Sequence, residues 1–169
     1  YRKTNDLEAA ILNGVEAELD DVFKLEDVKK FASNLHEQSD KPVFVTRGLR
    51  GMLTVDETGF NEIPGIGILK KVDPVGAGDT VVSALAVCLG SGIEPVQAGK
   101  FANFAAGVTV QKLFQTGTAS IEEIMDLAQD ADYIYQPELA SDLRQAEYIS
   151  GTEIEKCYAD VPLGGIRHA

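Results

Sequence analysis

Cysteine, long apolar runs and positive charge are all scarce in this 169-residue chain. Its two cysteines, Cys88 and Cys157, lie far apart in the sequence and fit no common metal-ligand spacing. We therefore expect a reducing, cytoplasmic location, with Cys88 as a core residue of an apolar helix. No apolar run approaches the roughly 18 residues that span a bilayer, and the first residues contain no apolar segment of the signal-peptide type.

The scarcity of positive charge limits the partners that this chain can have. It contains 15 Lys and Arg residues against 27 Asp and Glu residues, which gives a formal net charge of -12. This excess of negative charge argues against nucleic acid and against anionic membrane surfaces as partners. It does not exclude ATP, because backbone amides and a metal ion can form a phosphate site without basic side chains.

Apolar periodicity, caps and turn residues predict one α/β domain with a mostly parallel sheet flanked by helices. The first helix is marked by Asn5 as its N-cap, Glu8 at the capping-box position and Gly14 just after its end. The expected helices cover residues 5–12, 25–38, 80–89, 95–112 and 121–129, and the expected strands cover residues 43–46, 52–55, 60–63 and 67–72.

The composition changes after Asp130, where scattered aromatic and acidic residues follow without a long period. We expect residues 1–130 to form the main domain and residues 131–169 to be a linker or the start of an appended domain. Because the chain does not begin with Met, we also expect it to be processed or to be cut from a longer polypeptide.

The most informative stretch runs from Val72 to Thr80, with the sequence VDPVGAGDT, where a strand pattern becomes a helix pattern. Gly76, Ala77 and Gly78 are small enough for backbone N–H groups to approach an anion, and a helix N-terminus adds positive partial charge. A carboxylate at Asp79 can stay ionised there and accept a proton. The stretch therefore indicates phosphoryl transfer to a hydroxyl; a tight turn with Asp79 as an ordinary N-cap is the alternative.

Two other phosphate-binding patterns are excluded by the sequence. No Gly-x-x-x-x-Gly-Lys-Ser/Thr run occurs, so the chain is not a P-loop protein. The dinucleotide fingerprint fails as well, because Val81 stands where its third small residue is required.

Two motifs before this stretch carry candidate ligand-binding residues. Asn5 and Glu8 either form a simple capping box or hold Mg²⁺ through water. The glycine-rich turn at residues 46–51 either connects two strands only, or lines a nucleotide pocket with Thr46 and Gly48, since ligands in open α/β sheets bind beyond the carboxyl ends of strands.

Polar residues near these motifs have more than one reading. We expect Arg47 and Arg50 to be solvated surface residues, with contact to phosphate as the alternative. Asn103 lies in an otherwise apolar helix, and a buried Asn needs hydrogen-bond partners. It either bonds an adenine edge or caps a neighbouring loop.

In their order and spacing, these motifs resemble the ribokinase-like (PfkB) family of sugar kinases over about residues 3–124. The motifs are Asn-x-x-Glu at 5–8, Thr-x-Gly-x-x-Gly at 46–51, Asp-x-x-Gly-Ala-Gly-Asp at 73–79 and Ala-Asn-x-Ala-Ala at 102–106. Within the family, VTRG at 45–48 and GTAS at 117–120 are most similar to the kinase half of bifunctional ADP-heptose synthases. The family's sugar-binding residues lie mostly before the Asn-x-x-Glu motif, so the resemblance implies a C-terminal, nucleotide-side part of the full fold.

The resemblance implies an enzyme that uses ATP and Mg²⁺, and it assigns roles to individual residues. Asp79 would be the base that takes the proton of the acceptor hydroxyl, and Gly76, Ala77 and Gly78 would form the anion hole for the γ-phosphate. The remaining implied contacts are Asn5 and Glu8 with Mg²⁺ through water, Thr46, Gly48, Gly51 and Asn103 with the nucleotide, and Asp73 with a monovalent cation such as K⁺. Pro74 stands where Thr or Val is common and stiffens that cation loop.

Two hypotheses for the function follow from these motifs. The first is phosphoryl transfer from ATP to a hydroxyl of a sugar or sugar phosphate, with the acceptor-binding half missing from this chain. The alternative is a nucleotide-binding or interaction module without catalysis of its own. A half-domain leaves a sheet edge or an apolar face uncovered, so we expect a homo-oligomer or association through that edge.

Overall fold

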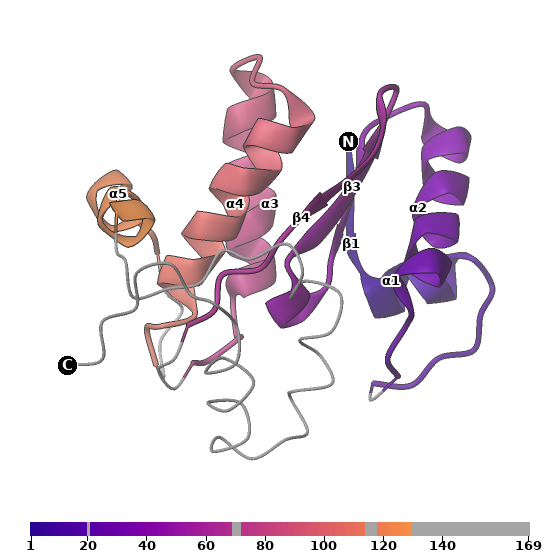
Figure 1. Ribbon diagram of the computed structural model, residues 1–169, viewed down its shortest axis with the longest axis horizontal. Coiled ribbons are helices and arrows are strands. Elements are labelled where there is room, and N and C mark those ends of the chain that lie inside the picture. Colours follow the sequence, from indigo (N-terminus) through magenta and orange to yellow (C-terminus); the bar gives the residue numbers. More distant parts are fainter. Residues whose placement is uncertain (20, 69–71, 114–117, 130–169) are drawn as a thin grey trace, which may run out of the picture.

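The computed structural model describes residues 1–19, 21–68, 72–113 and 118–129. Its elements are, in chain order, β1 (Arg2–Asn5), α1 (Asp6–Leu12), α2 (Leu25–Ser39), β2 (Val43–Thr46), the short 3-10 helix η1 (Gly48–Arg50), β3 (Met52–Asp56), β4 (Gly59–Ile63), α3 (Ala77–Gly90), α4 (Pro95–Thr109) and α5 (Ile121–Gln129). Figure 1 shows three layers, with the sheet between α1 and α2 on one face and α3 and α4 on the other. The α/β class is therefore confirmed, and residues 131–169, expected to be a linker, lie outside the described residues.

The sheet has the strand order β1-β2-β3-β4 and is mixed, whereas the sequence predicted a mostly parallel one. Only β1 and β2 pair in parallel, and β2, β3 and β4 form an antiparallel meander. The physical reason lies in the connections, because the short turns after β2 and β3 are too brief for a parallel crossover. Strand β1 was not predicted, since its four residues carry no apolar run.

The first helix is capped as the sequence predicted, with Asn5 as its N-cap. The Asn5 side chain accepts a hydrogen bond from the Glu8 N–H (2.7 Å), and the Glu8 carboxylate accepts one from the Asn5 N–H (2.8 Å). Helix α5 has the predicted bounds, and α2 is one residue longer than expected at its C-terminus. Within the described part of the chain, no helix combines the length and the hydropathy that crossing a membrane requires.

Helix α3 begins at Ala77, three residues earlier than the sequence pattern predicted. Gly76 is its N-cap, with a left-handed φ of 83° that favours glycine. Asp79 is therefore the third residue of the helix, and its interpretation as an N-cap is wrong. Of the strand expected at residues 67–72, Gly67 forms an isolated bridge, and residues 69–71 lie outside the described residues.

Two hydrophobic clusters lie on opposite faces of the sheet, because successive strand residues point to opposite sides. Phe44 of β2 belongs to the cluster beneath α3 and α4, and its neighbours Val43 and Val45 belong to the cluster beneath α1 and α2. Cys88 is buried in the first cluster, as expected, and this burial raises the pKa of its thiol. Gly99 allows α4 to lie close to the sheet, since a Cβ there would be 2.4 Å from Ile63 Cδ1.

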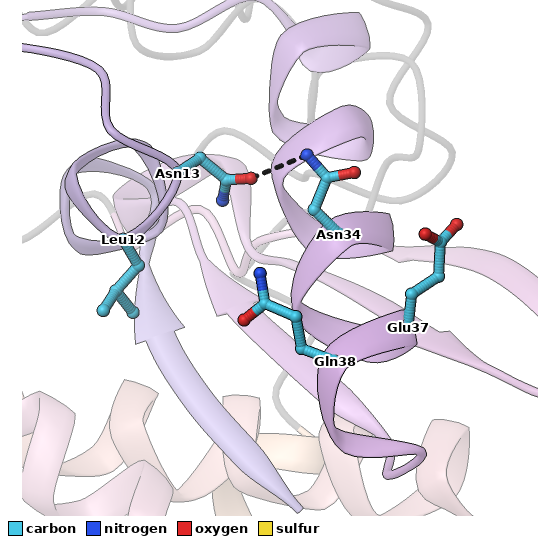
Figure 2. Close-up of a pocket in the computed structure, with 5 residues that line it drawn as sticks. All are labelled: Leu12, Asn13, Asn34, Glu37 and Gln38. Atoms are coloured by element: carbon cyan, nitrogen blue, oxygen red, sulfur yellow. Dashed lines mark hydrogen bonds between the residues drawn. The ribbon is translucent and has the colours of Figure 1, made fainter.

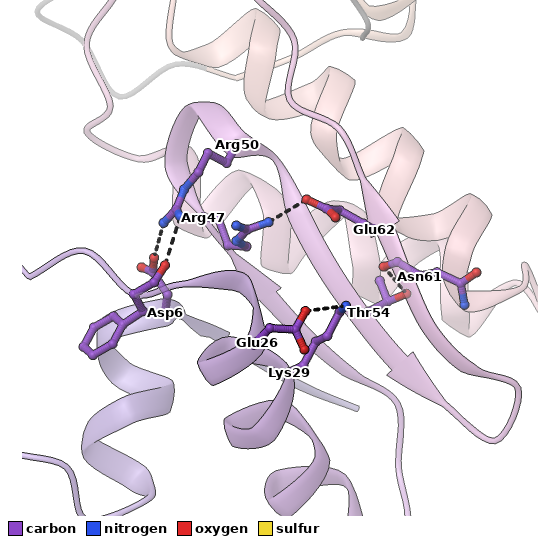
Figure 3. A network of polar contacts seen from close by, with 9 residues as sticks. Asp6, Glu26, Lys29, Arg47, Arg50, Thr54, Asn61 and Glu62 are labelled. Carbon is purple, nitrogen blue, oxygen red and sulfur yellow. Dashed lines mark hydrogen bonds and ion pairs between the residues drawn. The ribbon is translucent and has the colours of Figure 1, made fainter. Parts of the chain in front are cut away.

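Arg47 and Arg50 are buried, so the expectation that they are solvated is wrong. Figure 3 shows both guanidinium groups meeting carboxylates. Arg50 Nη2 lies 2.9 Å from Asp6 Oδ2, and both side chains are at most 3% exposed. Arg47 Nη1 lies 2.8 Å from Glu62 Oε1. A glycine-rich turn is usually exposed, but here the segment before α2 covers it, and Arg50 Nη1 donates to the Phe23 carbonyl at 3.0 Å.

The buried Asp6–Arg50 pair should dominate the polar contribution to stability. Replacing Arg50 with Met leaves the Asp6 carboxylate without its cation, so we expect Arg50→Met to lower the free energy of unfolding by about 3–5 kcal/mol. Lys30→Met is the matched control, because Lys30 forms an exposed ion pair with Asp27 at 3.1 Å, and such pairs contribute about 0.5 kcal/mol. Urea unfolding measures both values, and equal effects would contradict the prediction.

Candidate active site

One edge of the sheet collects several of the residues that the motifs single out. Asn5, Thr46, Met52 and Ile63 are successive register partners and form a row across the four strands. Because β1, β2 and β4 run in the same direction, their carboxyl ends meet at this row, where ligands of open α/β sheets bind. Asn5 and Thr46, predicted from separate motifs, are therefore direct neighbours, and the Thr46 hydroxyl donates to the Thr4 carbonyl at 3.2 Å.

Two turns cross in close backbone contact just beyond this row. A Cβ added to Gly51, which has a φ of 81°, would lie 2.2 Å from the Ile63 carbonyl oxygen. A Cβ added to Gly65 would lie 1.8 Å from the Leu49 carbonyl oxygen. The fold alone therefore requires glycine at position 51, and Gly48 has a left-handed φ of 58°. Contact of Gly48 and Gly51 with a nucleotide stays a prediction.

Asn103 ties α4 to the same edge of the sheet. Its Nδ2 donates to the Pro64 carbonyl at 2.7 Å, directly after the end of β4. This hydrogen bond corresponds to the loop-capping alternative for Asn103. A contact with an adenine edge stays a prediction.

The N-terminal turn of α3 lies next to β1. The Tyr1 hydroxyl donates to the Val82 carbonyl at 3.2 Å. One helical turn earlier, a Cβ added to Gly78 would lie 3.4 Å from Lys3 Nζ. From Tyr1 to Lys3 the strand advances by two residues, and from Val82 back to Gly78 the helix advances by four; both steps are roughly 6 to 7 Å long. β1 and α3 therefore run side by side in opposite directions, and the carboxyl end of β1 reaches the start of α3.

The backbone amides at the start of α3 differ in their hydrogen bonding. The first N–H groups of a helix have no partner within the helix. The Ala77 N–H donates to the Pro74 carbonyl at 3.1 Å, and the Thr80 N–H donates to the Gly76 carbonyl at 3.0 Å. Among the described residues, no backbone acceptor faces the N–H groups of Gly78 and Asp79. These two N–H groups can donate to an anion without losing a backbone hydrogen bond to any described residue.

Two anchors hold the loop that leads into α3. The Asp73 carboxylate accepts a hydrogen bond from the Val75 N–H at 3.1 Å, and the Asp73 N–H donates to the Val110 carbonyl at 2.8 Å. The Thr80 and Thr109 hydroxyls lie 3.1 Å apart and join α3 to α4. Sequence reasoning missed Thr109, because a Thr within an apolar helix gives no distinct signal.

Gly78 stands apart from the other glycines of the site. It lies inside α3 with an ordinary helical backbone, and the only atom near its added Cβ would be the flexible Lys3 ammonium at 3.4 Å. Alanine is the better residue for a helix, by up to about 1 kcal/mol. The fold of the described residues therefore gives no reason for glycine at this position.

Asp79 projects from the same turn and is exposed. In the described part of the chain, no ion pair engages its carboxylate. A cavity of about 420 Å³ opens beside it, between α3, α4 and the start of α5. Its polar lining consists mainly of Asp79, Thr80, Ser83 and Thr118. A small molecule can therefore reach the Asp79 carboxylate from solvent.

Lys112, which follows α4, contacts residues at and before the start of α5. Lys112 Nζ lies 2.7 Å from Glu123 Oε1 and also donates to the Thr118 carbonyl. The hydrogen bond from Lys112, with one from the Ser120 backbone, lowers the pKa of the Glu123 carboxyl. The Glu123 carboxylate, held by Lys112 and by the Ser120 N–H, therefore joins the start of α5 to the end of α4.

A second groove lies on the opposite face of the sheet, between α1 and α2 (Figure 2), and has a volume of about 410 Å³. Asn34 Nδ2 donates to Asn13 Oδ1 at 2.8 Å, and Asn13 Nδ2 donates to the Ala9 carbonyl at 2.8 Å. These amides cap α1 and join it to α2. The groove is thus explained by helix packing.

The residues present suit an indirectly held metal ion. Within the ranges that the structure describes, no three His, Cys, Asp or Glu side chains gather to ligate a metal directly. Asn5 and Glu8 offer an amide and a carboxylate at the edge of the sheet. Mg²⁺ keeps several of its waters and is often bound through few carboxylates. This donor set fits a water-mediated Mg²⁺.

Comparison with known proteins places the chain in a family. The pfkB family carbohydrate kinase model matches residues 1–124. The chain is 42% identical over 111 residues to the bifunctional protein HldE of Gluconacetobacter diazotrophicus, and 40% identical over 121 residues to the bifunctional protein HldE of Shewanella denitrificans. These alignments cover 64% and 70% of the chain but only 23% and 24% of the relatives, so the chain spans about a quarter of their length.

Solved structures of kinases are similar to this one. Phosphofructokinase-2 from Escherichia coli, in complex with potassium, aligns with a TM-score of 0.64 and 24% identity, over 74% of this chain and 38% of that chain. Ribokinase from Thermotoga maritima aligns with a TM-score of 0.61 and 25% identity, over 76% and 41%. With its mixed sheet between two helical layers, this chain has a ribokinase-like fold and belongs to the pfkB family of carbohydrate kinases.

Proposed function

We propose that the chain forms the nucleotide side of an ATP-dependent kinase that phosphorylates a hydroxyl of a sugar or sugar phosphate. Gly78 carries this proposal. The described fold does not require glycine at this position, and Gly78 lies in the same helical turn as the exposed Asp79 carboxylate. Membership of the carbohydrate kinase family supports the type of reaction. The chain covers about a quarter of its relatives, so the acceptor site is part of the proposal.

Asp79 acts as the general base in this proposal. Its carboxylate takes the proton of the acceptor hydroxyl, and the hydroxyl oxygen forms a bond to the terminal phosphorus of ATP. The bond from that phosphorus to its bridging oxygen breaks, and the electron pair leaves with ADP. Gly76, Ala77 and Gly78 form the anion hole, in which the Gly78 N–H donates to the transferring phosphoryl oxygens. In support, this N–H has no backbone acceptor among the described residues.

The other predicted site residues, at and near the carboxyl ends of the strands, bind the nucleotide and its cations. Thr46, Gly48, Gly51 and Asn103 surround the nucleotide. Asn5 and Glu8 would hold Mg²⁺ through water, and Mg²⁺ neutralises phosphate charge when bound. Asp73 organises its loop for a monovalent cation such as K⁺. A cytoplasmic location agrees with these ligands.

Asp79→Asn tests the base directly. We expect kcat to fall about 10²- to 10⁴-fold, because the amide cannot accept the proton, while MgATP binding measured by calorimetry stays unchanged. Asp27→Asn is the matched control, since Asp27 is also the third residue of an exposed helix turn. ADP release is followed in the full-length polypeptide over a panel of sugars and sugar phosphates, and a loss of only a few-fold would remove Asp79 from the role of base.

Gly78→Ala separates ligand contact from folding. We expect the free energy of unfolding to change by less than about 1 kcal/mol, while phosphoryl transfer is lost because the new methyl group occupies the phosphate position. Gly51→Ala should instead lower the free energy of unfolding. The left-handed backbone costs a residue other than glycine roughly 1–2 kcal/mol, and the new Cβ would lie 2.2 Å from the Ile63 carbonyl oxygen. Full activity in a well-folded Gly78→Ala variant would contradict the anion hole.

The isolated chain should associate with itself. In the described sheet, β1 lies at one edge and pairs only with β2. Val87 of α3 and Ile121 and Met125 of α5 are 67%, 62% and 51% exposed. We expect sedimentation velocity to show dimers or larger species as concentration rises, and a clean monomer at high concentration would argue against this.

A further inference from the structure

Arg47 lies between Thr46 and Gly48, and its side chain stands at an unspecified position of the Thr-x-Gly-x-x-Gly motif. We propose that Arg47 is a positioning residue for the nucleotide. Its ion pair with Glu62 holds two walls of the nucleotide site together, the turn at residues 46–51 and the segment that follows β4. This inference rests on the proposed kinase function, and it concerns binding of the nucleotide rather than the transfer step.

The Arg47 side chain reaches across a whole strand. Strand β3 lies between β2 and β4 in the sheet, and Arg47 directly follows β2, whereas Glu62 belongs to β4. Glu62 pairs in register with Leu53 of β3, which belongs to the hydrophobic cluster beneath α1 and α2. The contact of 2.8 Å between Arg47 Nη1 and Glu62 Oε1 therefore crosses β3 on the α2 face (Figure 3) and joins the turn after β2 to β4.

The backbone of Arg47 connects this ion pair to the rest of the turn. The Arg47 N–H donates to the Gly51 carbonyl at 2.8 Å, and the Arg47 carbonyl accepts a hydrogen bond from the Arg50 N–H at 3.2 Å. These two hydrogen bonds close the turn at residues 46–51 on itself. A displacement of Arg47 would therefore move the turn as a unit.

The segment after β4 is the second wall. It crosses the turn in close backbone contact, which limits how near the two segments come but does not hold them together. Two residues after Glu62, the Pro64 carbonyl accepts a hydrogen bond from Asn103 Nδ2 at 2.7 Å. The ion pair of Arg47 therefore connects the turn at residues 46–51 to Asn103, the predicted nucleotide contact on α4.

Stability of the fold does not account for an arginine at position 47. Its side chain is 0% exposed, and that of Glu62 is 26% exposed. Arg47 Nε and Nη2 are buried and have no hydrogen-bond partner among the described residues, and buried donors without a partner are costly. Apolar residues in place of a buried ion pair are often equally stable or more stable. The connection between the two walls gives this costly side chain a purpose.

Arg47→Met in the full-length polypeptide tests the positioning role. We expect the KM for ATP to rise about tenfold and kcat to stay within about threefold, because the nucleotide wall moves while Asp79 and Gly78 of α3 do not. Leu35→Ala is the matched control, since Leu35 is 1% exposed and packs in the cluster on the same face. It should lower the melting temperature but change the KM for ATP by no more than about twofold. An equal rise of the KM in both variants, or a rise in neither, would overturn the proposal.

The double variant Arg47→Met/Glu62→Met separates position from stability. Arg47→Met alone removes the guanidinium group that faces the Glu62 carboxylate, whereas the double variant removes both charges. We therefore expect the double variant to regain melting temperature. Its KM for ATP should stay raised, because the two walls are still not joined. Recovery of the melting temperature and of the KM together would overturn the proposal, because the ion pair would then act on stability alone.

The side-chain amide of Asn103 gives a spectroscopic signature that needs no nucleotide. If the ion pair holds the segment after β4 against the turn, its loss alters the hydrogen bond from Asn103 to the Pro64 carbonyl. We expect Arg47→Met and the double variant to shift the NMR signals of this amide, and Leu35→Ala to leave them in place. Unchanged Asn103 signals in a folded Arg47→Met variant would contradict the connection between the walls.

The failure of this inference is distinguishable from the failure of the proposed function. If Asp79→Asn abolishes turnover while Arg47→Met leaves the KM for ATP unchanged, the kinase function stands and the role of Arg47 falls. If the full-length polypeptide shows no turnover, calorimetry with MgADP decides. A weaker affinity in Arg47→Met than in Leu35→Ala would then support the role of Arg47 without the kinase function, and equal affinities or no binding would overturn it.

Discussion

The buried ion pair between Asp6 and Arg50 is the constraint on which the arrangement of the sheet edge depends. Asp6 is the first residue of α1, directly after β1, and Arg50 belongs to the turn that follows β2. One contact at 2.9 Å therefore joins the two segments that leave the parallel strands. Arg50 also holds the segment before α2 through the Phe23 carbonyl. A buried charge tolerates only a partner in good geometry. The positions of Asn5 and of the turn at residues 46–51 are therefore coupled.

The candidate active site and the buried ion pairs of the chain lie on different faces of the sheet. The ion pairs of Arg47 and Arg50 are on the α1 and α2 side (Figure 3), whereas Gly78 and Asp79 start a helix on the other side (Figure 1). The two sides meet at the carboxyl ends of the strands. The α3 side needs no internal ion pair near Gly78, because small residues, backbone amides and the Thr80–Thr109 contact hold it.

The sequence predicted those parts of the fold whose cause is local. The capping box of Asn5 and Glu8 and the amphipathic pattern of α2 depend on near neighbours, and both are confirmed. Strand β1 depends on pairing with a strand about 40 residues away, so its polar sequence gave no signal. The burial of Arg47 and Arg50 and the position of Lys3 depend in turn on tertiary contacts. Asp79 and Gly78 were identified from a motif, but only the structure separates Gly78, which the fold does not require, from Gly51, which it does.

The pairing of β1 with β2 has a consequence for which cation faces α3. Arg2 pairs with Val43 and Lys3 with Phe44, and the side chains of a strand alternate between faces. A slip of one residue in this register would turn Lys3 toward α2 and bring Arg2 or Thr4 to the start of α3. A single residue inserted between β1 and α1 would therefore place the neutral hydroxyl of Thr4 where the lysine lies, without changing any residue from Gly76 to Asp79.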